Sequence, residues 1–365
     1  MSVSASTTVK PASIWRSKTF TMLLMSSFLL TVGNKIYEIV LPLIMYEITH
    51  SSVSMASMRT AELLPNLLFA VFIGVFVDRV NKKKWVLWMV GAQAVLLFAL
   101  AYLFKTNNQA LYLYYIAGFL LMTFNYGYFN AQVSLTKLSV PPSHLTSANA
   151  KFTFVETFVS VMGPALSGMI FLLADLSDGV LITAICYLLC LLFMFQLSVE
   201  ESKAEKTKGH FWRDIQEGWI TFKTNDLLWM VTIFVVFLNC TMTVVSTTIV
   251  FYAKDVLHLS SSLLAAVLSI SGVGGLLGSL LINWLRPRIG LGKIFGMSAF
   301  LNGSAYIGLY FCTNLAVLSV SLFIIGFALS IHSTAVYTLR HEQTPGHLMG
   351  RIGGITGTIF RVACR

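Results

Sequence analysis

Charged side chains stand inside two long apolar segments near the start of the chain. Lys35 and Glu38 are three residues apart in an apolar run over about 19–43, and Arg59 and Glu62 repeat that spacing in the next run. Residues three apart share one face of a helix, so each acid can pair with its neighbouring base. Charges within a membrane span usually face an aqueous cavity or a bundle interior. The pairs predict a proton- or substrate-handling site, with internal ion pairs or interfacial anchoring as the alternatives.

Three further polar side chains stand in apolar runs farther along the chain. Asn125 and Asn239 each lie on the polar face of one run, and Glu156 belongs to a polar stripe at 150–174. Such groups either line a cavity or form hydrogen bonds between helices. We include all three in the predicted proton and substrate pathway.

A short basic turn follows the second apolar run. Residues 74–84 read Gly-Val-Phe-Val-Asp-Arg-Val-Asn-Lys-Lys-Lys, and this charge cannot lie in hydrocarbon. Its basic residues predict a tight loop on the cytoplasmic side of a membrane. Asn81 stands where a left-handed turn residue is expected, and asparagine tolerates that conformation. The residues singled out here are Gly74, Asp78, Arg79, Lys82 and Lys83.

Small residues and a proline interrupt the run that contains Glu156. Gly163 and Pro164 are followed by Ser167 and Gly168. Proline removes a backbone donor and kinks a helix, and small residues let neighbouring helices approach closely. The segment predicts a kinked, tightly packed helix.

Composition indicates that the chain uses lipid as its solvent. Hydrophobic residues make up 56% of the sequence and charged residues only 11%, against about 25% charged in a soluble domain. The formal net charge of +10 is spread between apolar runs and not gathered in one polar module, so it indicates membrane topology and not nucleic-acid binding. With the N-terminus inside, only Lys105 and Lys254 fall on outer loops. This bias predicts a cytoplasmic N-terminus.

The apolar runs predict an all-α polytopic membrane protein. About 10–11 spans are expected from runs of about 20 residues. The predicted spans lie at 19–43, 53–77, 85–104, 110–136, 150–174, 179–198, 227–252, 260–284, 293–312 and 315–338, with another from about 351. The expected organisation is a cytoplasmic tail at 1–18, a six-helix bundle at 19–198, a cytoplasmic linker with an amphipathic helix at 199–226, and a second bundle at 227–365. A Pro-x-His-Leu sequence occurs at both His144 and His347, which is consistent with an internal repeat.

The order of these features resembles the major facilitator superfamily. The basic turn is similar to its cytoplasmic signature, and residues 163–168 are similar to its antiporter signature, with Ser167 replacing a glycine. The chain looks most like the bacterial macrolide efflux and enterobactin exporter group. That group has twelve helices in two pseudo-symmetric bundles. A helix that is unfinished at Arg365 predicts a C-terminally truncated member.

The resemblance implies proton-coupled efflux of an amphipathic small molecule by alternating access. Asp78 is expected to meet the positive N-terminal end of the helix after residue 350, and Arg79 and the lysines to support this latch. Desolvation disfavours a charged carboxyl group, so a buried acid can take up a proton. Glu38 and Glu156 are the expected proton acceptors, and Lys35 the modulating partner.

Other functions stay open at this point. The alternatives are a proton-coupled importer of the same fold and a truncated member that does not transport. A membrane enzyme is not expected, because His144, His341 and His347 have no paired acid motif beside them. The expected partners are a small-molecule substrate, protons and the lipid bilayer of a bacterial cell membrane. We expect no cofactor, metal or nucleic acid, no catalytic residue, and a monomer.

Overall fold

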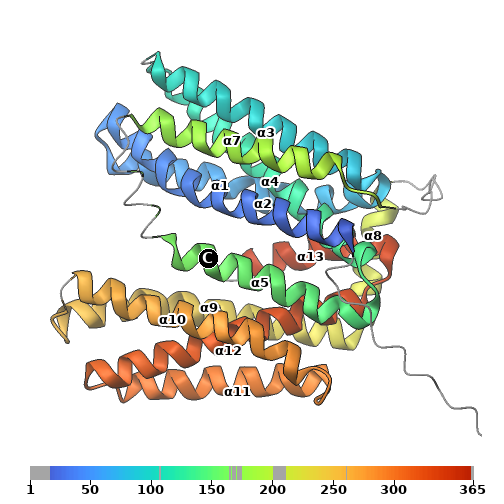
Figure 1. Cartoon of the computed structure of the whole chain (residues 1–365), viewed down its shortest axis with the longest axis vertical. Coiled ribbons are helices and arrows are strands. Elements are labelled where there is room, and N and C mark those ends of the chain that lie inside the picture. Colours follow the sequence, from blue (N-terminus) through green and yellow to red (C-terminus); the bar gives the residue numbers. More distant parts are fainter. Residues whose placement is uncertain are drawn as a thin grey trace, which may run out of the picture.

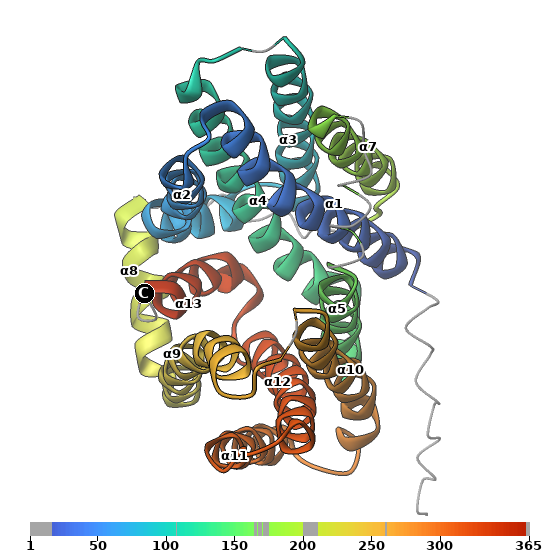
Figure 2. The ribbon, with the colours of Figure 1, turned by 90° about the vertical axis from the view of Figure 1, so that its left-hand side faces the viewer.

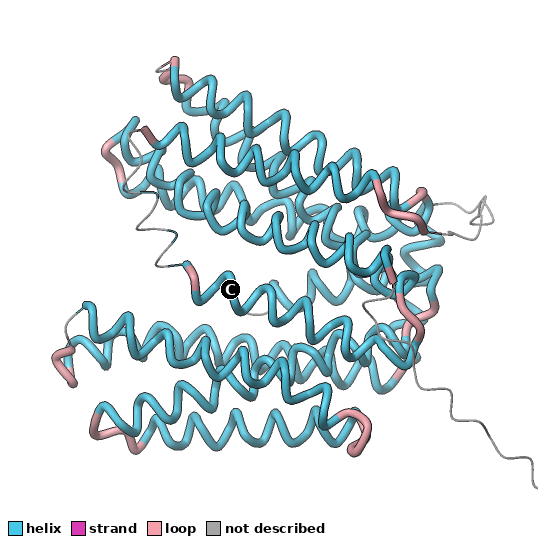
Figure 3. Tube along the Cα trace, viewed as in Figure 1, coloured by secondary structure: helices cyan, strands magenta, loops and turns pink. Residues whose placement is uncertain are grey.

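Every regular element of the described chain is helical. The computed structural model describes residues 17–106, 108–163, 166, 170, 175–199, 211–259 and 261–362. Figure 3 shows helices and loops but no strand in this part. The helices are α1 (Lys18–Thr49), α2 (Ser52–Arg79), α3 (Lys82–Lys105), α4 (Leu111–Ser139), α5 (Leu145–Val161), α7 (Leu176–Phe195), α8 (Phe211–Thr224), α9 (Asp226–Asp255), α10 (Ser261–Leu285), α11 (Leu291–Tyr310), α12 (Leu315–Gln343) and α13 (Met349–Val362). Short 3-10 turns at Pro142–His144 and Gly346–Leu348 precede α5 and α13.

Seven of the described helices are long and apolar enough to cross a membrane. They are α1, α2, α3, α7, α9, α10 and α12. Their lengths agree with the distance across a bilayer. The prediction of an all-α polytopic membrane protein is therefore confirmed.

The helices form two groups that meet at one end. In the first group α1 and α3 pack on α7, and α2 and α3 pack on α4; in the second, α10 and α11 pack on α12. Figure 1 shows the two groups diverging on the left and converging on the right, where α8 lies. The division of the chain into one bundle at 19–198 and a second at 227–365 stays a prediction.

Two helices, α5 and α13, pack mainly on helices from the opposite half of the chain. α5 lies against α10 and α12, although it also touches α1, and α13 lies against α2 and α4 (Figure 2). The contact between the groups therefore depends on helices that are distant in sequence. Their N-terminal ends lie at the end of the molecule where the groups converge.

Two local details differ from the sequence-based expectations. Asn81 is not a left-handed residue, because its backbone is extended with φ −66° and ψ 116°. Its side chain instead accepts a hydrogen bond from the backbone N–H of Lys84 and caps the start of α3. The predicted helix at 150–174 begins earlier, at Leu145, since the preceding turn at Pro142–His144 leads directly into it.

Candidate functional site

A cavity of about 800 Å³ lies among α1, α2, α4 and α5. It contains five of the seven residues in the predicted pathway. These are Glu38, Arg59, Glu62, Asn125 and Glu156. All the other residues that line it also precede the linker, so the first half of the chain supplies its polar surface.

An ion-pair cluster joins α1 and α2 at the wall of this cavity. Lys35 Nζ lies 3.0 Å from Glu38 Oε2, and Arg59 Nη1 lies 3.0 Å from Glu62 Oε2. Arg59 also reaches α1, with Nη2 3.9 Å from Glu38 Oε1 and a hydrogen bond to the Glu38 carbonyl. Glu38 is therefore shared by two cations. Lys35 belongs to the cluster without lining the cavity itself.

The three acids that line the cavity differ in their exposure. Glu62 is buried, with 3% of its side chain exposed, whereas 49% of Glu38 is exposed. Glu156 is also exposed, and it has no ion pair in the part of the chain that the structure describes. Both expected acceptors thus line the same cavity, Glu38 from α1 and Glu156 from α5.

Amide side chains fix the rest of the polar wall. Asn34 donates to Asn125 Oδ1 at 3.3 Å and accepts from the Tyr187 hydroxyl at 2.5 Å. These contacts tie α1 to α4 and α7 and hold Asn125 at the cavity. Asn239 of α9 does not line this cavity, so the structure does not bring it together with the other pathway residues.

The two helix groups meet at one end of the molecule through a contact between α2 and α13. Asp78 Oδ1 accepts a hydrogen bond from Gly350 N at 2.7 Å, and Oδ2 accepts one from Arg351 N at 2.8 Å. These are the first free backbone donors of α13, where the helix dipole also favours an anion. A Cβ atom added at Gly74 would overlap the Gly350 carbonyl oxygen, so the two helices cross at glycines. Asp78 meets the helix end that the family resemblance implied.

The amphipathic helix α8 completes this contact. Arg79 Nη2 lies 2.5 Å from Asp214 Oδ2, and Arg351 Nη2 lies 3.2 Å from the same oxygen. Arg351 Nη1 also lies 2.6 Å from Glu217 Oε2. We call these residues, with Asp78 and Gly350, the charged seam. Asp214 is nearly fully buried, and its two arginine partners come from opposite halves of the chain.

Lys82 and Lys83 of the basic turn contact other parts of the first helix group. Lys83 Nζ donates to the carbonyl oxygens of Phe195 and Leu197, at 3.0 and 2.5 Å, and so binds the end of α7. Lys82 is buried and interacts electrostatically with Asp78. Of the predicted kink residues, Gly163 lies beside the Lys35 side chain, while Pro164 and Gly168 lie outside the described residues.

Sequence reasoning missed the acidic residues of α8. Asp214 and Glu217 are three residues apart on a helix that also carries four aromatic and two basic residues, so the two acids share one face. That spacing was visible in the sequence, but nothing local identified Arg351 as the partner. The partners are 134 or more residues apart along the chain.

The fold and the site define a multi-pass membrane protein in which two helix groups meet at one end and a polar cavity lies among the helices. This is the architecture of secondary transporters. Residues 23–364 match the family model described as Major Facilitator Superfamily, so the chain belongs to that superfamily.

Curated relatives of the chain are transporters and not enzymes. The staphyloferrin A transporter of Staphylococcus aureus (strain NCTC 8325 / PS 47) is 24% identical over 318 residues, covering 82% of this chain and 76% of the relative. The putative bacilysin exporter BacE of Bacillus subtilis (strain 168) is 23% identical over 313 residues, covering 81% and 72%.

Solved structures share the fold at low sequence identity. A bacterial homologue of the iron transporter ferroportin, in an outward-facing state with soaked iron, has a TM-score of 0.78 at 17% identity. The match covers 94% of this chain and 89% of the other. A structure of the E. coli fucose:proton symporter FucP has a TM-score of 0.77 at 13% identity, with 96% and 90% covered.

Proposed function

We propose that the chain is a secondary active transporter that exports an amphipathic small molecule in exchange for protons, by alternating access. The observation that supports this most directly is the cavity of about 800 Å³, which contains three carboxylates, in a molecule whose helix groups meet at one end through the charged seam. A cavity near the contact of two bundles is where transporters of this kind bind their cargo. In this proposal the bundles at 19–198 and 227–365 rock against each other.

The basic turn supports an outward-facing assignment for this conformation. Lys82, Lys83 and Lys84 follow α2 at the closed end, and cytoplasmic loops carry an excess of such residues. If the closed end is cytoplasmic, the N-terminus is cytoplasmic as well and the cavity faces outward. Opening toward the cytoplasm then requires the charged seam to separate, as in the latch role proposed for Asp78 and Arg79.

Glu156 is the better-placed proton acceptor of the two proposed. It faces the cavity with no cation paired to it in the described chain, so it can gain a proton without breaking an ion pair. Glu38 is shared by Lys35 and Arg59, so a proton or a cationic cargo group must compete with these cations there. We therefore assign proton uptake mainly to Glu156 and cargo-linked rearrangement to the Glu38 cluster.

The cargo class is proposed from the cavity and from the relatives. Amide, hydroxyl and charged groups line the cavity together with apolar ones such as Leu63, Met122 and Phe129, which suits an amphipathic molecule. The curated relatives are a transporter of the siderophore staphyloferrin A and a putative exporter of bacilysin. A metallophore or a small antibiotic is accordingly the cargo that we propose.

Transport by inverted membrane vesicles tests this function. Vesicles with an imposed proton gradient are given a panel of macrolides, bacilysin-like peptides, and carboxylate and catecholate siderophores. We expect one class of compound to accumulate inside the vesicles as protons leave them. The Glu38→Gln/Glu156→Gln double variant should lose this accumulation. Glu47→Gln is the matched control, because Glu47 is an exposed acid of α1 outside the cavity.

The same assay separates export from import. Cargo that moves in the same direction as protons identifies a symporter and overturns the exchange mechanism. Undiminished gradient-driven transport by the double variant contradicts the assignment of the two acids. The single variants then show whether Glu156 or Glu38 carries the larger effect.

A further inference from the structure

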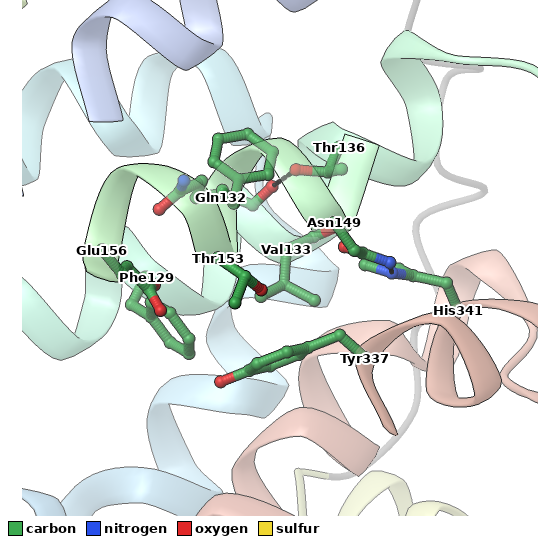
Figure 4. A pocket seen from close by; sticks show the side chains of 10 residues that line it. Phe129, Gln132, Val133, Thr136, Asn149, Thr153, Glu156, Tyr337 and His341 are labelled. Atoms are coloured by element: carbon green, nitrogen blue, oxygen red, sulfur yellow. Dashed lines mark hydrogen bonds between the residues drawn. The ribbon is translucent and has the colours of Figure 1, made fainter. Parts of the chain in front are cut away.

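A second contact between the helix groups lies where α12 ends against α4 and α5. Figure 4 shows Asn149 and His341 side by side there, with Glu156 at the opposite end of the same small pocket. Asn149 and His341 are 5% and 2% exposed, so neither is solvated by bulk water. We call Asn149, Thr338, His341 and Lys137 the amide seam.

Hydrogen bonds around Asn149 orient its amide group. The Thr338 hydroxyl has one hydrogen, which it donates to the Thr334 carbonyl at 2.7 Å. Thr338 Oγ1 must then accept from Asn149 Nδ2, which is 3.1 Å away. The second hydrogen of Nδ2 is directed to His341 Nδ1 at 3.0 Å. Turning the amide over would require the Thr338 hydroxyl to leave Thr334.

The two ring nitrogens of His341 therefore need opposite roles. Nδ1 accepts from the Asn149 amide, so it carries no proton. Nε2 lies 3.0 Å from the Val133 carbonyl oxygen, which can only accept, so Nε2 carries the hydrogen. A neutral imidazole satisfies both contacts. A doubly protonated ring would set Nδ1–H against the Asn149 N–H group, and would leave the Tyr337 carbonyl oxygen, one turn earlier on α12, as its other acceptor beside Val133.

The surrounding charges are also unfavourable for a positive ring. Lys137 of α4 donates to the carbonyl oxygens of His341, at 2.6 Å, and Thr344. Arg340 precedes His341 on α12, and both Lys137 and Arg340 interact electrostatically with the ring. Two acids of the neighbouring elements do not contact the ring: Glu342 pairs with Arg286, the residue after α10, and Glu156 of α5 lies at the far end of the pocket.

We propose that His341 is a positioning residue of the closed state, whose neutral ring ties α12 to α4 and α5 and whose protonation releases this contact. Cytoplasmic acid then favours the state in which the closed end opens. This contact would regulate the opening of the closed end. It is separate from the protons that are exchanged for cargo in the proposed function. It rests on the proposed function only in naming the closed end as cytoplasmic.

Hydrogen–deuterium exchange of the whole protein in detergent tests this without any cargo. The observed segments are the last turn of α12 and the first turns of α5, at about pD 7.5 and about pD 5.5, on either side of ordinary histidine titration. His341→Gln is the neutral mimic, since its amide can accept from Asn149 and donate to Val133. His341→Arg is the charged mimic. Comparing variants at the same pD cancels the intrinsic pD dependence of exchange.

The expected pattern is specific to protonation of the ring. At about pD 7.5 the unaltered protein and His341→Gln should exchange equally, and His341→Arg at least about threefold faster. At about pD 5.5 the unaltered protein should exchange faster than His341→Gln. Equal exchange of these two at both pD values overturns the proposal, even if the arginine variant does not fold.

Asn149→Asp provides a second, opposite test. An aspartate at this position offers only acceptors, so it pairs with a protonated ring and leaves the neutral tautomer at Nδ1 unsatisfied. Exchange in this variant should slow as the pD falls, relative to Asn149→Asp with His341→Gln. A purely structural role of Asn149 predicts faster exchange at both pD values with no reversal, which would contradict the proposal.

Discussion

The two contacts that close the molecule use different chemistry at the same end. The charged seam buries Asp78 and Asp214 against arginines and helix-terminal N–H groups. The amide seam contains no carboxylate, and its one cation, Lys137, donates to backbone carbonyls. The charged seam depends on pairing buried carboxylates with positive groups. The amide seam depends on which nitrogen and oxygen atoms carry the hydrogens. The two seams should therefore respond to different perturbations.

The energetic consequence follows from burial. Removing one partner of a buried charge pair leaves the other charge uncompensated, which costs more than losing a neutral hydrogen bond. A hydrogen-bonded contact between neutral groups is weaker but can be reversed by adding a single proton. The charged seam thus suits a strong closure, and the amide seam suits its adjustment.

The largest effect is expected from Asp78→Ala in the charged seam. The variant leaves the Gly350 and Arg351 N–H groups without their acceptor and removes a carboxylate beside the buried Arg351 guanidinium. We expect the closed state to lose about 3–5 kcal/mol. Hydrogen–deuterium exchange of the first turn of α13 measures the loss, and Asp78→Asn should lose less because it keeps one acceptor. Unchanged exchange in Asp78→Ala would mean that the seam does not hold α13.

A smaller loss of closure is expected when a side chain at Gly74 separates α2 from α13. A Cβ atom at Gly74 would overlap the Gly350 carbonyl oxygen, and backbone atoms cannot move aside as a flexible side chain can. Gly74→Ala should cost about 1–3 kcal/mol of closure, seen as faster exchange in α13 but not in α5. Gly91→Ala in α3 is the control, since no atom lies within 4 Å of its added Cβ. Alanine favours a helix more than glycine does, so helix propensity alone would slow exchange in both variants. Equal acceleration by both substitutions would contradict the crossing as the cause.

Lys137→Met should weaken the amide seam by about 1–2 kcal/mol. The His341 and Thr344 carbonyl oxygens lose a charged donor, while the apolar stem of the side chain is kept. Faster exchange is expected at the end of α12, with α13 unchanged. Lys151→Met, one helix away on α5, is the matched comparison. Loss of protection in α13 as well would show that the two seams open as one unit.

The smallest effect is expected at the rim of the charged seam. Glu217 contacts Arg351 at 2.6 Å, but 48% of its side chain is exposed, so water screens the pair. Glu217→Gln should change closure by well under about 1 kcal/mol. Asp214→Asn should have the greater effect, because that carboxylate is buried between Arg79 and Arg351. A thermal unfolding series of both variants ranks them, and the reverse order would contradict the burial argument.

Sequence alone determined the class of the protein and most of its helices. Apolar runs and the scarcity of charge require lipid as solvent, and backbone groups in lipid must be satisfied within helices. The pairing of Lys35 with Glu38 and of Arg59 with Glu62 also followed from local spacing. Asp78 as the partner of a later helix end came from resemblance to a family, because no local pattern identifies such a partner.

Tertiary structure decided how these helices combine. Only packing showed that α5 lies against α10 and α12, that Asn239 does not line the cavity, and that Glu38 and Glu156 line it together. Hydrogen bonds join Asp78 to Gly350 across 272 residues and Asn149 to His341 across 192. Helix formation depends on neighbours within a few residues, whereas these contacts depend on where whole helices come to rest, and no short-range periodicity encodes that.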